Sequence, residues 1–274
     1  MLRWIILVGV FLGFGGLFVL QKNSITTKQT SPLSDATATQ TPTAFPSTSL
    51  SPTAVKGFKL SKLAYRIALY GDSLIDTMVD APDNVETVLR STYPQNLFKV
   101  YNYGIGAQNV EAGLDRWNNS FSNRGREYPP IANVDADVII IGSFAFNPFS
   151  PHDPEKHKQL LTQLVEKAKK TNARVFMLAE IAPLGDDFGK GPKGVNWTAD
   201  QAREQSLHII EQLKNVFAIA KEENVPVIDV FNQSKLPGSE FGRRELVNTD
   251  DGIHPSPQGH KLTADTIVSE IHLK

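Results

Sequence analysis

Short apolar runs alternate with longer amphipathic stretches from Lys59 to the end of the chain. The clearest run, Asp137–Ile141, has the length and the β-branched content of a buried strand. Runs of similar character lie at Arg66–Tyr70, Leu97–Tyr101, Ala173–Ala182 and Val225–Val230. Strands that alternate with helices favour an α/β fold, so we expect a mostly parallel, five-stranded sheet with helices on both faces.

Helix signals separate these runs. Pro154 opens one helix, and Ala199–Glu223 has the apolar spacing of a long amphipathic helix. Lys261–Leu273 carries the pattern of the last helix, for which Ser256 is the expected cap and Pro257 the expected first residue. These signals fill the spaces between the predicted strands, as an α/β fold requires.

Four groups of glycine and polar residues stand in a fixed order along the chain. They are Gly71-Asp72-Ser73-Leu74, Asn102-Tyr103-Gly104-Ile105-Gly106, Gly142 through Asn147, and Asp251-Gly252-Ile253-His254. The first three follow predicted strands, and Asn147 stands just beyond the C-terminal end of one. Open α/β sheets bind ligands at that end of their strands. The groups therefore predict a functional site at the carboxyl edge of the sheet.

A serine early in the chain and a histidine late in it suit hydrolytic chemistry. Ser73 lies where a predicted strand passes into a helix, close to backbone N–H groups that favour a developing negative charge. His254 is the candidate base that takes the serine proton, and Asp251 can fix the imidazole tautomer. Taken singly, Ser73 is an ordinary helix cap and Asp251 an ordinary turn residue. That alternative does not account for their order.

The four groups resemble the sequence blocks of the SGNH, or GDSL-type, hydrolase family. The resemblance implies a three-layer, flavodoxin-like α/β/α sandwich and a triad of Ser73, Asp251 and His254. It also implies an oxyanion hole made of the N–H groups of Ser73 and Gly106 and the side-chain amide of Asn147. No metal and no organic cofactor is implied.

The resemblance covers roughly residues 62–274 and departs from the family in the third block. The family has Gly-x-Asn-Asp there, whereas this chain has Gly142-Ser143-Phe144-Ala145-Phe146-Asn147-Pro148. Proline therefore stands where the family has its second acidic residue. The departure keeps open the alternative of a catalytically inactive surface-binding module.

Composition excludes several classes of function. The net charge of −1 gives no basic excess for nucleic acid. The absence of cysteine excludes a disulfide framework, a cysteine nucleophile, a thiolate metal site and a lipoprotein anchor. His152, Asp153 and His157 lack the spacing of a metal site, so we expect them at the surface. His208 and His260 lie in helical stretches and are expected to be structural.

The N-terminal part divides into two further segments. Residues 1–23 include an uncharged run from Trp4 to Leu20, whose helix of about 25 Å is near the lower limit for crossing a membrane. Residues 24–58 are rich in Ser, Thr and Pro and are typical of a disordered stalk. A cleavable signal peptide is the alternative to a retained anchor. Residues 59–274 are the predicted hydrolase-like domain.

Two loops flank the predicted site. The glycine-rich residues 184–198 follow the fourth strand and are expected to form a mobile substrate lid, with Trp197 facing a sugar or an acyl group. The alternative is a solvated insertion with Trp197 in the core. Residues 118–131 are expected to be a rim loop in which Arg124 and Arg126, near Tyr128, are solvated.

The sequence therefore predicts a membrane-anchored, extracytoplasmic serine esterase that acts through an acyl-enzyme. The expected substrate is an O-acyl or O-acetyl ester, on a cell-surface polysaccharide or a lipid, and no nucleic acid is involved. An acyltransferase that passes the acyl group to a surface glycan would use the same triad. The acyl length and the oligomeric state stay open.

Overall fold

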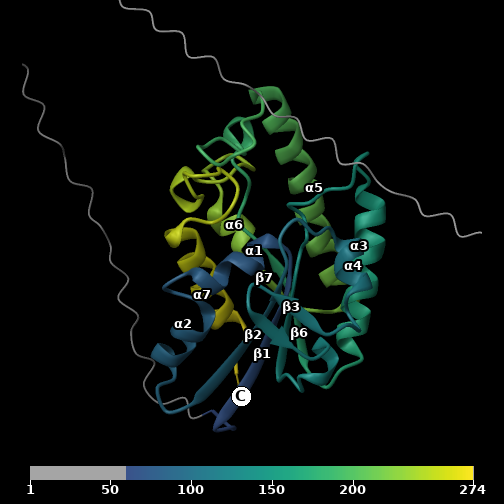
Figure 1. Cartoon of the computed structure of the whole chain (residues 1–274), viewed down its shortest axis with the longest axis vertical. Helices are drawn as coiled ribbons and strands as arrows, with labels where there is room; N and C mark the ends of the chain where they lie inside the picture. The colour runs from purple at the N-terminus through teal and green to yellow at the C-terminus, as the bar shows by residue number, and fades with distance from the viewer. Residues whose placement is uncertain (1–59, 274) are drawn as a thin grey trace, which may run out of the picture. The chain divides into compact units, whose positions relative to one another are not determined.

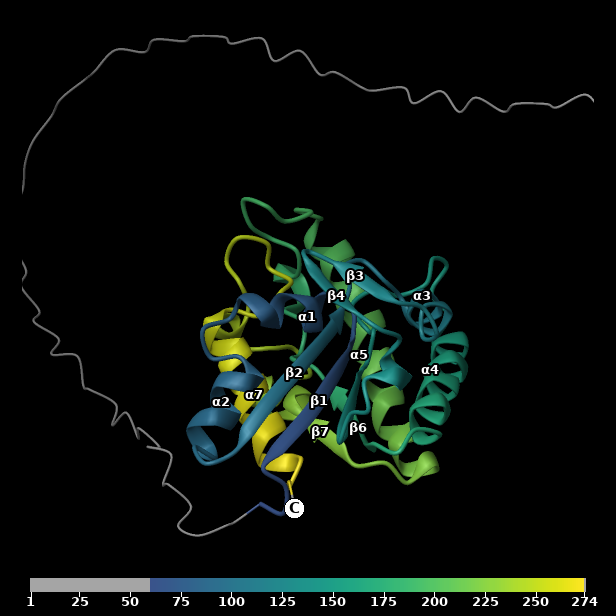
Figure 2. The ribbon, with the colours of Figure 1, turned by 60° about the horizontal axis from the view of Figure 1, so that its bottom comes forward.

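Residues 60–273 are described by the computed structural model of the chain, drawn in Figures 1 and 2. Its centre is a five-stranded sheet in the order β2-β1-β5-β6-β7, and every neighbouring pair in it is parallel. The strands span Ala64–Gly71 (β1), Leu97–Gly104 (β2), Val138–Gly142 (β5), Arg174–Ala179 (β6) and Val227–Asp229 (β7). The expected five-stranded parallel sheet is confirmed.

The C-terminal ends of two strands, β2 and β6, differ from the predicted ends. β2 continues beyond Tyr101 to Gly104, because Asn102, Tyr103 and Gly104 pair with the last residues of β1. The predicted strand Ala173–Ala182 is too long at its end. Its last three residues are buried, but the neighbouring strand β7 pairs only with Met177, Leu178 and Ala179. The buried run therefore continues for three residues beyond the end of β6.

Helices cover both faces of the sheet, as the three-layer prediction requires. Figure 2 shows α2 and α7 on one side and α3, α4 and α5 on the other. These helices span Val85–Thr92 (α2), Val110–Asp115 (α3), Pro154–Lys169 (α4), Ala199–Glu223 (α5) and Pro257–Glu270 (α7). In α4 the buried residues His157, Leu161, Leu164, Val165 and Ala168 form one face. Residues three and four apart lie on one side of a helix, so this face packs inward.

Capping residues determine where α5 and α7 begin. The Ser256 hydroxyl accepts a hydrogen bond from the Gly259 N–H at 3.2 Å, and Pro257 is the first residue of α7, as predicted. α7 therefore starts at Pro257 and not at Lys261. The predicted bounds of α5 are confirmed, and Thr198 forms a capping box with Gln201 at its start.

The residues 118–131 do not form the expected loop. They contain the antiparallel hairpin of β3 (Phe121–Asn123) and β4 (Arg126–Tyr128). Its two central residues, Arg124 and Gly125, have φ values of 50° and 74°. Positive φ at both positions suits the tight turns of two-residue hairpins, which follow the twist of the strands.

Short elements complete the described part of the chain. They are α1 (Ser73–Asp76), η1 (Thr77–Asp80), η2 (Ile131–Asn133), η3 (Gly185–Asp187), α6 (Val230–Ser234) and η4 (Arg244–Leu246). Among residues 60–273, no helix is both long enough and apolar enough to span a membrane. The predicted membrane helix in residues 1–23 and the predicted stalk in residues 24–58 lie outside the described residues.

Candidate active site

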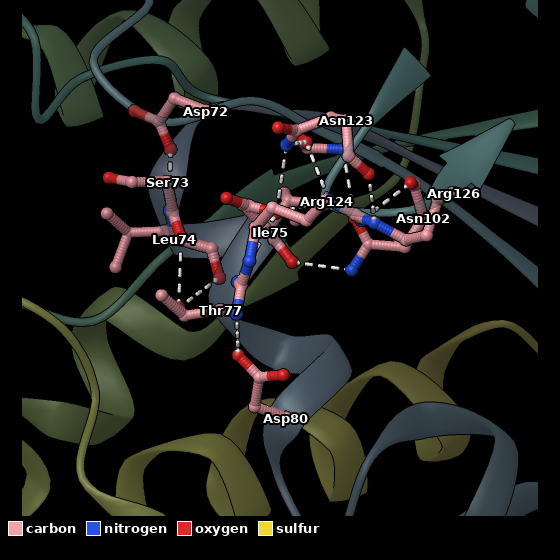
Figure 3. A network of polar contacts seen from close by, with 12 residues as sticks. Asp72, Ser73, Leu74, Ile75, Thr77, Asp80, Asn102, Asn123, Arg124 and Arg126 are labelled. Atoms are coloured by element: carbon pink, nitrogen blue, oxygen red, sulfur yellow. Dashed lines mark hydrogen bonds and ion pairs between the residues drawn. The ribbon is translucent and has the colours of Figure 1, made fainter. Parts of the chain in front are cut away.

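Ser73 is the first residue of α1, and only Asp72 separates it from the last residue of β1 (Figure 3). Asp72 caps the helix: its Oδ1 accepts a hydrogen bond from the Leu74 N–H at 3.0 Å. The helix lies on the backbone at the end of β2, since a Cβ at Gly104 would stand only 2.2 Å from the Asp76 nitrogen. Only glycine allows so close an approach. The strand-to-helix turn therefore presents the Ser73 side chain at the carboxyl edge of the sheet.

A polar network lies beneath α1 and fastens it to the β3–β4 hairpin (Figure 3). Arg126 forms a short ion pair with Asp76, and its Nη1 donates to the Asn102 carbonyl at 2.8 Å and to Asn102 Oδ1 at 2.7 Å. The Asn102 side-chain amide donates in turn to the Ile75 carbonyl at 2.6 Å. The Arg126 side chain is only 10% exposed. The expectation that it is solvated is therefore wrong, because its partner is a buried carboxylate.

The second block brings Gly106 next to the nucleophile. The Ile105 N–H donates to the Gly71 carbonyl at 3.2 Å, so the chain leaving β2 still runs beside the end of β1. A Cβ at Gly106 would lie 3.9 Å from the Cβ of Ser73. Ser73 and Gly106 are thus neighbours, as the resemblance implies.

Asn147 reaches the same turn from the loop after β5. Its side-chain amide donates to Asp72 Oδ2 at 3.0 Å, so one of its two N–H groups is committed and the other is available for a ligand. The chain has Pro148 where the family has an acid. Asp72, from the first block, supplies a carboxylate that holds the Asn147 amide.

Two buried carboxyl groups lie below this edge. Asp72 is 1% exposed and Glu180, just after β6, is 3% exposed. Burial raises the pKa of Asp72 to about 6, against the hydrogen bonds from Leu74 and Asn147. Burial and the nearby Asp72 charge raise the pKa of Glu180 to about 8. Glu180 was missed from the sequence, although a carboxylate inside the apolar run Ala173–Ala182 is itself an unusual feature.

His254 and Asp251 form a hydrogen-bonded pair. His254 Nδ1 lies 2.8 Å from Asp251 Oδ2, while Asp251 Oδ1 accepts the N–H groups of Ile253 at 2.8 Å and His254 at 3.0 Å. Burial acts to raise the pKa of Asp251, but these hydrogen bonds outweigh it and hold that pKa below its usual value. With Nδ1 donating to the carboxylate, Nε2 is left as a proton acceptor.

The histidine and the serine approach the site from different loops. His254 is close enough to Asp72 to act on its charge, and Asp72 is the residue before Ser73. Within residues 60–273, however, no hydrogen bond joins the Ser73 hydroxyl to the His254 ring. Catalytic hydrogen bonds are often long in unliganded sites and tighten when substrate binds.

The glycine-rich loop 184–198 packs on the loop that carries Asp251. The Gly189 N–H donates to the Gly252 carbonyl at 3.0 Å, and the Lys193 N–H donates to the Asp250 carbonyl at 2.7 Å. A Cβ at Gly194 would lie 2.7 Å from the Asp251 carbonyl oxygen. The segment is irregular, as predicted, apart from the single turn η3. Its contacts join it to the Asp251–His254 pair.

Trp197 lies at the end of this loop. It stacks on Phe188 with ring centroids 6.3 Å apart and remains 37% exposed. The alternative that places Trp197 in the core is therefore wrong. The partly exposed indole face is available to a ligand.

A cavity of about 220 Å³ lies beside the second block. Ile105 and Gln108, which flank Gly106, line it together with Arg116. The Arg116 guanidinium donates to the Gly71 carbonyl at 2.8 Å and to Gln108 Oε1 at 2.6 Å. Ser73 and His254 are not among the residues that line this cavity.

The histidines outside this site differ from one another. His157 is 1% exposed, and its Nε2 lies 2.8 Å from the Ser143 carbonyl, so the expected surface position is wrong. Burial lowers its pKa to about 4. His152 stacks on His208 at 3.9 Å, and His260 is buried in α7. Within residues 60–273 no three His, Cys, Asp or Glu side chains are grouped so that they could hold a metal ion.

The structure resembles several solved esterases at low sequence identity. The acetyl xylan esterase AlAXEase shares 18% identity with a TM-score of 0.55, over 75% of this chain and 99% of that one. A GDSL-like lipase from Bacteroides thetaiotaomicron shares 15% with a TM-score of 0.54, over 76% and 87%. A lipase/acylhydrolase from Enterococcus faecalis shares 21% with a TM-score of 0.53, over 76% and 95%. These likenesses show the fold.

Sequence comparison gives the family. No curated protein matches the chain. The model of the GDSL-like lipase/acylhydrolase family matches residues 67–267, which is more than half of the sequence and includes all four blocks. The chain therefore belongs to the GDSL-like lipase/acylhydrolase family, and it is a hydrolase that acts on ester bonds.

Proposed function

We propose that this protein is a serine esterase with a triad of Ser73, His254 and Asp251. The observation that carries the proposal is the Asp251–His254 pair at 2.8 Å, which leaves the histidine Nε2 unbonded within the described residues, close to the turn that bears Ser73. An imidazole held in this tautomer is the base that a serine nucleophile needs.

The proposed reaction passes through an acyl-enzyme. The Ser73 oxygen attacks the ester carbonyl while His254 Nε2 takes the hydroxyl proton, and the resulting imidazolium is stabilised by Asp251. The N–H groups of Ser73 and Gly106 and the free N–H of Asn147 stabilise the oxyanion. His254 returns the proton to the leaving alcohol. A water molecule then attacks the acyl-enzyme carbonyl, with His254 again as the base, and the acid is released from Ser73.

The proposed substrate is a short O-acyl group, such as acetyl, on a polysaccharide. The acetyl xylan esterase AlAXEase is among the structures with this fold. The composition of residues 1–58 supports a membrane-anchored, extracytoplasmic location, where surface glycans are the available esters.

A fluorophosphonate probe tests the nucleophile. We expect the full-length protein to be labelled and the Ser73→Ala variant to lose the label. Ser91, an exposed serine in α2, serves as the control, and Ser91→Ala should keep the label. The same three proteins should be compared on p-nitrophenyl esters of increasing chain length and on acetylated xylan. Absence of labelling and turnover in the native protein would favour an inactive binding module.

Two further measurements separate the remaining alternatives. Release of acid into water without any acceptor sugar would argue against an acyltransferase. Deletion of residues 1–23 is expected to move the protein from the membrane fraction to the soluble fraction. If it does not, the anchor proposal fails while the esterase proposal stands.

A further inference from the structure

Asp72 and Glu180 are two acids buried at the carboxyl ends of strands on either side of β5. Asp72 follows β1 and Glu180 follows β6, and each is at most 3% exposed. β5 ends between them at Gly142, where a Cβ would stand 2.7 Å from Glu180 Oε1. The absence of a side chain at Gly142 gives Glu180 its place behind the third block.

Each acid is bonded to a different part of the proposed oxyanion site. Asp72 accepts the side-chain amide of Asn147 at 3.0 Å. Glu180 accepts the Ser143 N–H on both oxygens, at 3.0 and 3.2 Å. Ser143 and Asn147 belong to the same loop, so the two carboxyl groups together hold that loop from below.

Among residues 60–273, no cation lies close enough to Glu180 to act on its charge. The groups that face Asp72 are His254 and, more weakly, Arg116. The groups that face Glu180 are Asp72 and the N–H and hydroxyl of Ser143. From α4, the buried His157 bonds the Ser143 carbonyl and is neutral at ordinary pH, because burial lowers its pKa to about 4.

We propose that Glu180 is a positioning residue that retains a proton in the active enzyme, so that Asp72 alone is ionised and orients the Asn147 amide. This inference rests on the proposed function for its catalytic consequence. Two buried carboxylates at the ends of the strands on either side of β5 repel each other, and a proton on one of them removes that repulsion. A charge on Glu180 would also place a second anion behind the site where the oxyanion forms.

The pKa values support this order of ionisation. The pKa of Asp72 is raised to about 6 and that of Glu180 to about 8, so Asp72 loses its proton first. Between these values the pair carries one negative charge. Below this window Asp72 is protonated and its hold on Asn147 weakens. Above it both groups are charged and the oxyanion is destabilised.

Glu180→Gln tests the proposal, because glutamine matches a protonated glutamate in shape and lack of charge. The full-length wild type should lose kcat/KM as the pH rises through about 8, with a tenfold fall per pH unit beyond the midpoint. Glu180→Gln should lack this fall, whereas the exposed control Glu166→Gln should retain it. The same alkaline fall in Glu180→Gln and wild type would overturn the proposal.

A stability measurement decides the matter even if no turnover is found. A group whose folded pKa is raised stabilises the fold below its unfolded pKa and loses that contribution as the pH rises to the folded pKa. The Tm of wild type relative to Glu180→Gln should therefore fall from about pH 5 to about pH 8 and then stay constant. A Tm difference that is independent of pH over this range would overturn the proposal, whatever the activity.

Discussion

The serine end of the proposed triad is fastened by buried side chains, whereas the histidine end is fastened by backbone contacts between two loops. Below Ser73, the ion pair of Asp76 and Arg126 joins α1 to the β3–β4 hairpin. Around His254, the loop 184–198 donates two N–H groups to the chain that carries Asp251. The first arrangement is part of the folded core, and the second lies at its rim.

This difference separates stability from activity. Removing a buried ionic partner leaves an uncompensated charge, which costs folding free energy. Shifting a rim loop by a fraction of an ångström leaves the core intact but moves a reacting group. We therefore expect changes at the serine end to be visible first in unfolding and changes at the histidine end first in kcat.

The largest effect is expected for Asp251→Asn. Asparagine can still accept the N–H groups of Ile253 and His254, but its amide would face His254 Nδ1 and favour the wrong imidazole tautomer. We expect kcat to fall by about 10⁴-fold, as for the equivalent change in a serine protease. Steady-state kinetics on a p-nitrophenyl ester checks this, and a fall of less than tenfold would contradict the role of Asp251.

The same variant sharpens the comparison at acid pH. The pKa of Asp251 is held below its usual value, so its stabilising contribution is present above the unfolded pKa and lost as the pH falls through the folded pKa. The Tm of wild type should exceed that of Asp251→Asn at neutral pH by an amount that shrinks on acidification below about pH 4.

The next largest effect is expected for Arg126→Met. This change removes the close ion pair of the buried Asp76, which keeps only the more distant Arg124 guanidinium at 3.7 Å, and should lower the free energy of unfolding by about 3–5 kcal/mol. Arg124→Met is the matched control on the same hairpin. The Arg124 side chain is 46% exposed, so its loss should cost at most about 1 kcal/mol. Urea unfolding measures both, and equal losses would break the proposed distinction.

A smaller effect, confined to activity, is expected for Gly194→Ala. The added Cβ would stand 2.1 Å from the Gly189 carbonyl oxygen and 2.7 Å from that of Asp251. The two loops must separate, which should lower kcat by roughly 10- to 100-fold. The unfolding midpoint should change little. Unchanged kcat would mean that loop 184–198 does not position Asp251.

The smallest effect is expected for Lys193→Met in the same loop. Lys193 pairs with Asp250 at 2.7 Å, but the two side chains are 76% and 50% exposed. Such a surface pair contributes little to stability, because solvent screens both charges. Thermal unfolding and kcat should both stay near wild type. A large loss would show that the ion pair, and not the backbone contact, holds the two loops together.

Local signals made much of the fold predictable from the sequence. The run Asp137–Ile141 predicted the strand β5 because Val138–Ile141 are apolar on both faces of a covered sheet. Pro154 and Ser256 mark helix starts because a proline at the first position and a serine cap act within a single turn. The order of the four blocks was likewise sufficient to suggest Ser73, Gly106 and Asn147 as neighbours of one site.

The features that escaped prediction depend on partners distant in sequence. Arg126 is buried because it pairs with Asp76, the last residue of α1, which is fifty positions away in the sequence. Glu180 accepts the N–H of Ser143, which follows the neighbouring strand β5, and no local sequence pattern predicts this contact. His157 is different. It lies on the same helical face as Leu161 and Leu164, so its burial could have been predicted from the spacing of the apolar residues.

The contact of α1 with Gly104 has a consequence for how this protein can change over time. Main chain meets main chain there, so no apolar core side chain separates α1 from the end of β2. Substitutions can accumulate in the interior, and the lining of the pocket can drift toward other acyl groups, without altering that contact. Proteins that share this scaffold can therefore differ widely in substrate while the serine keeps its position relative to the second block.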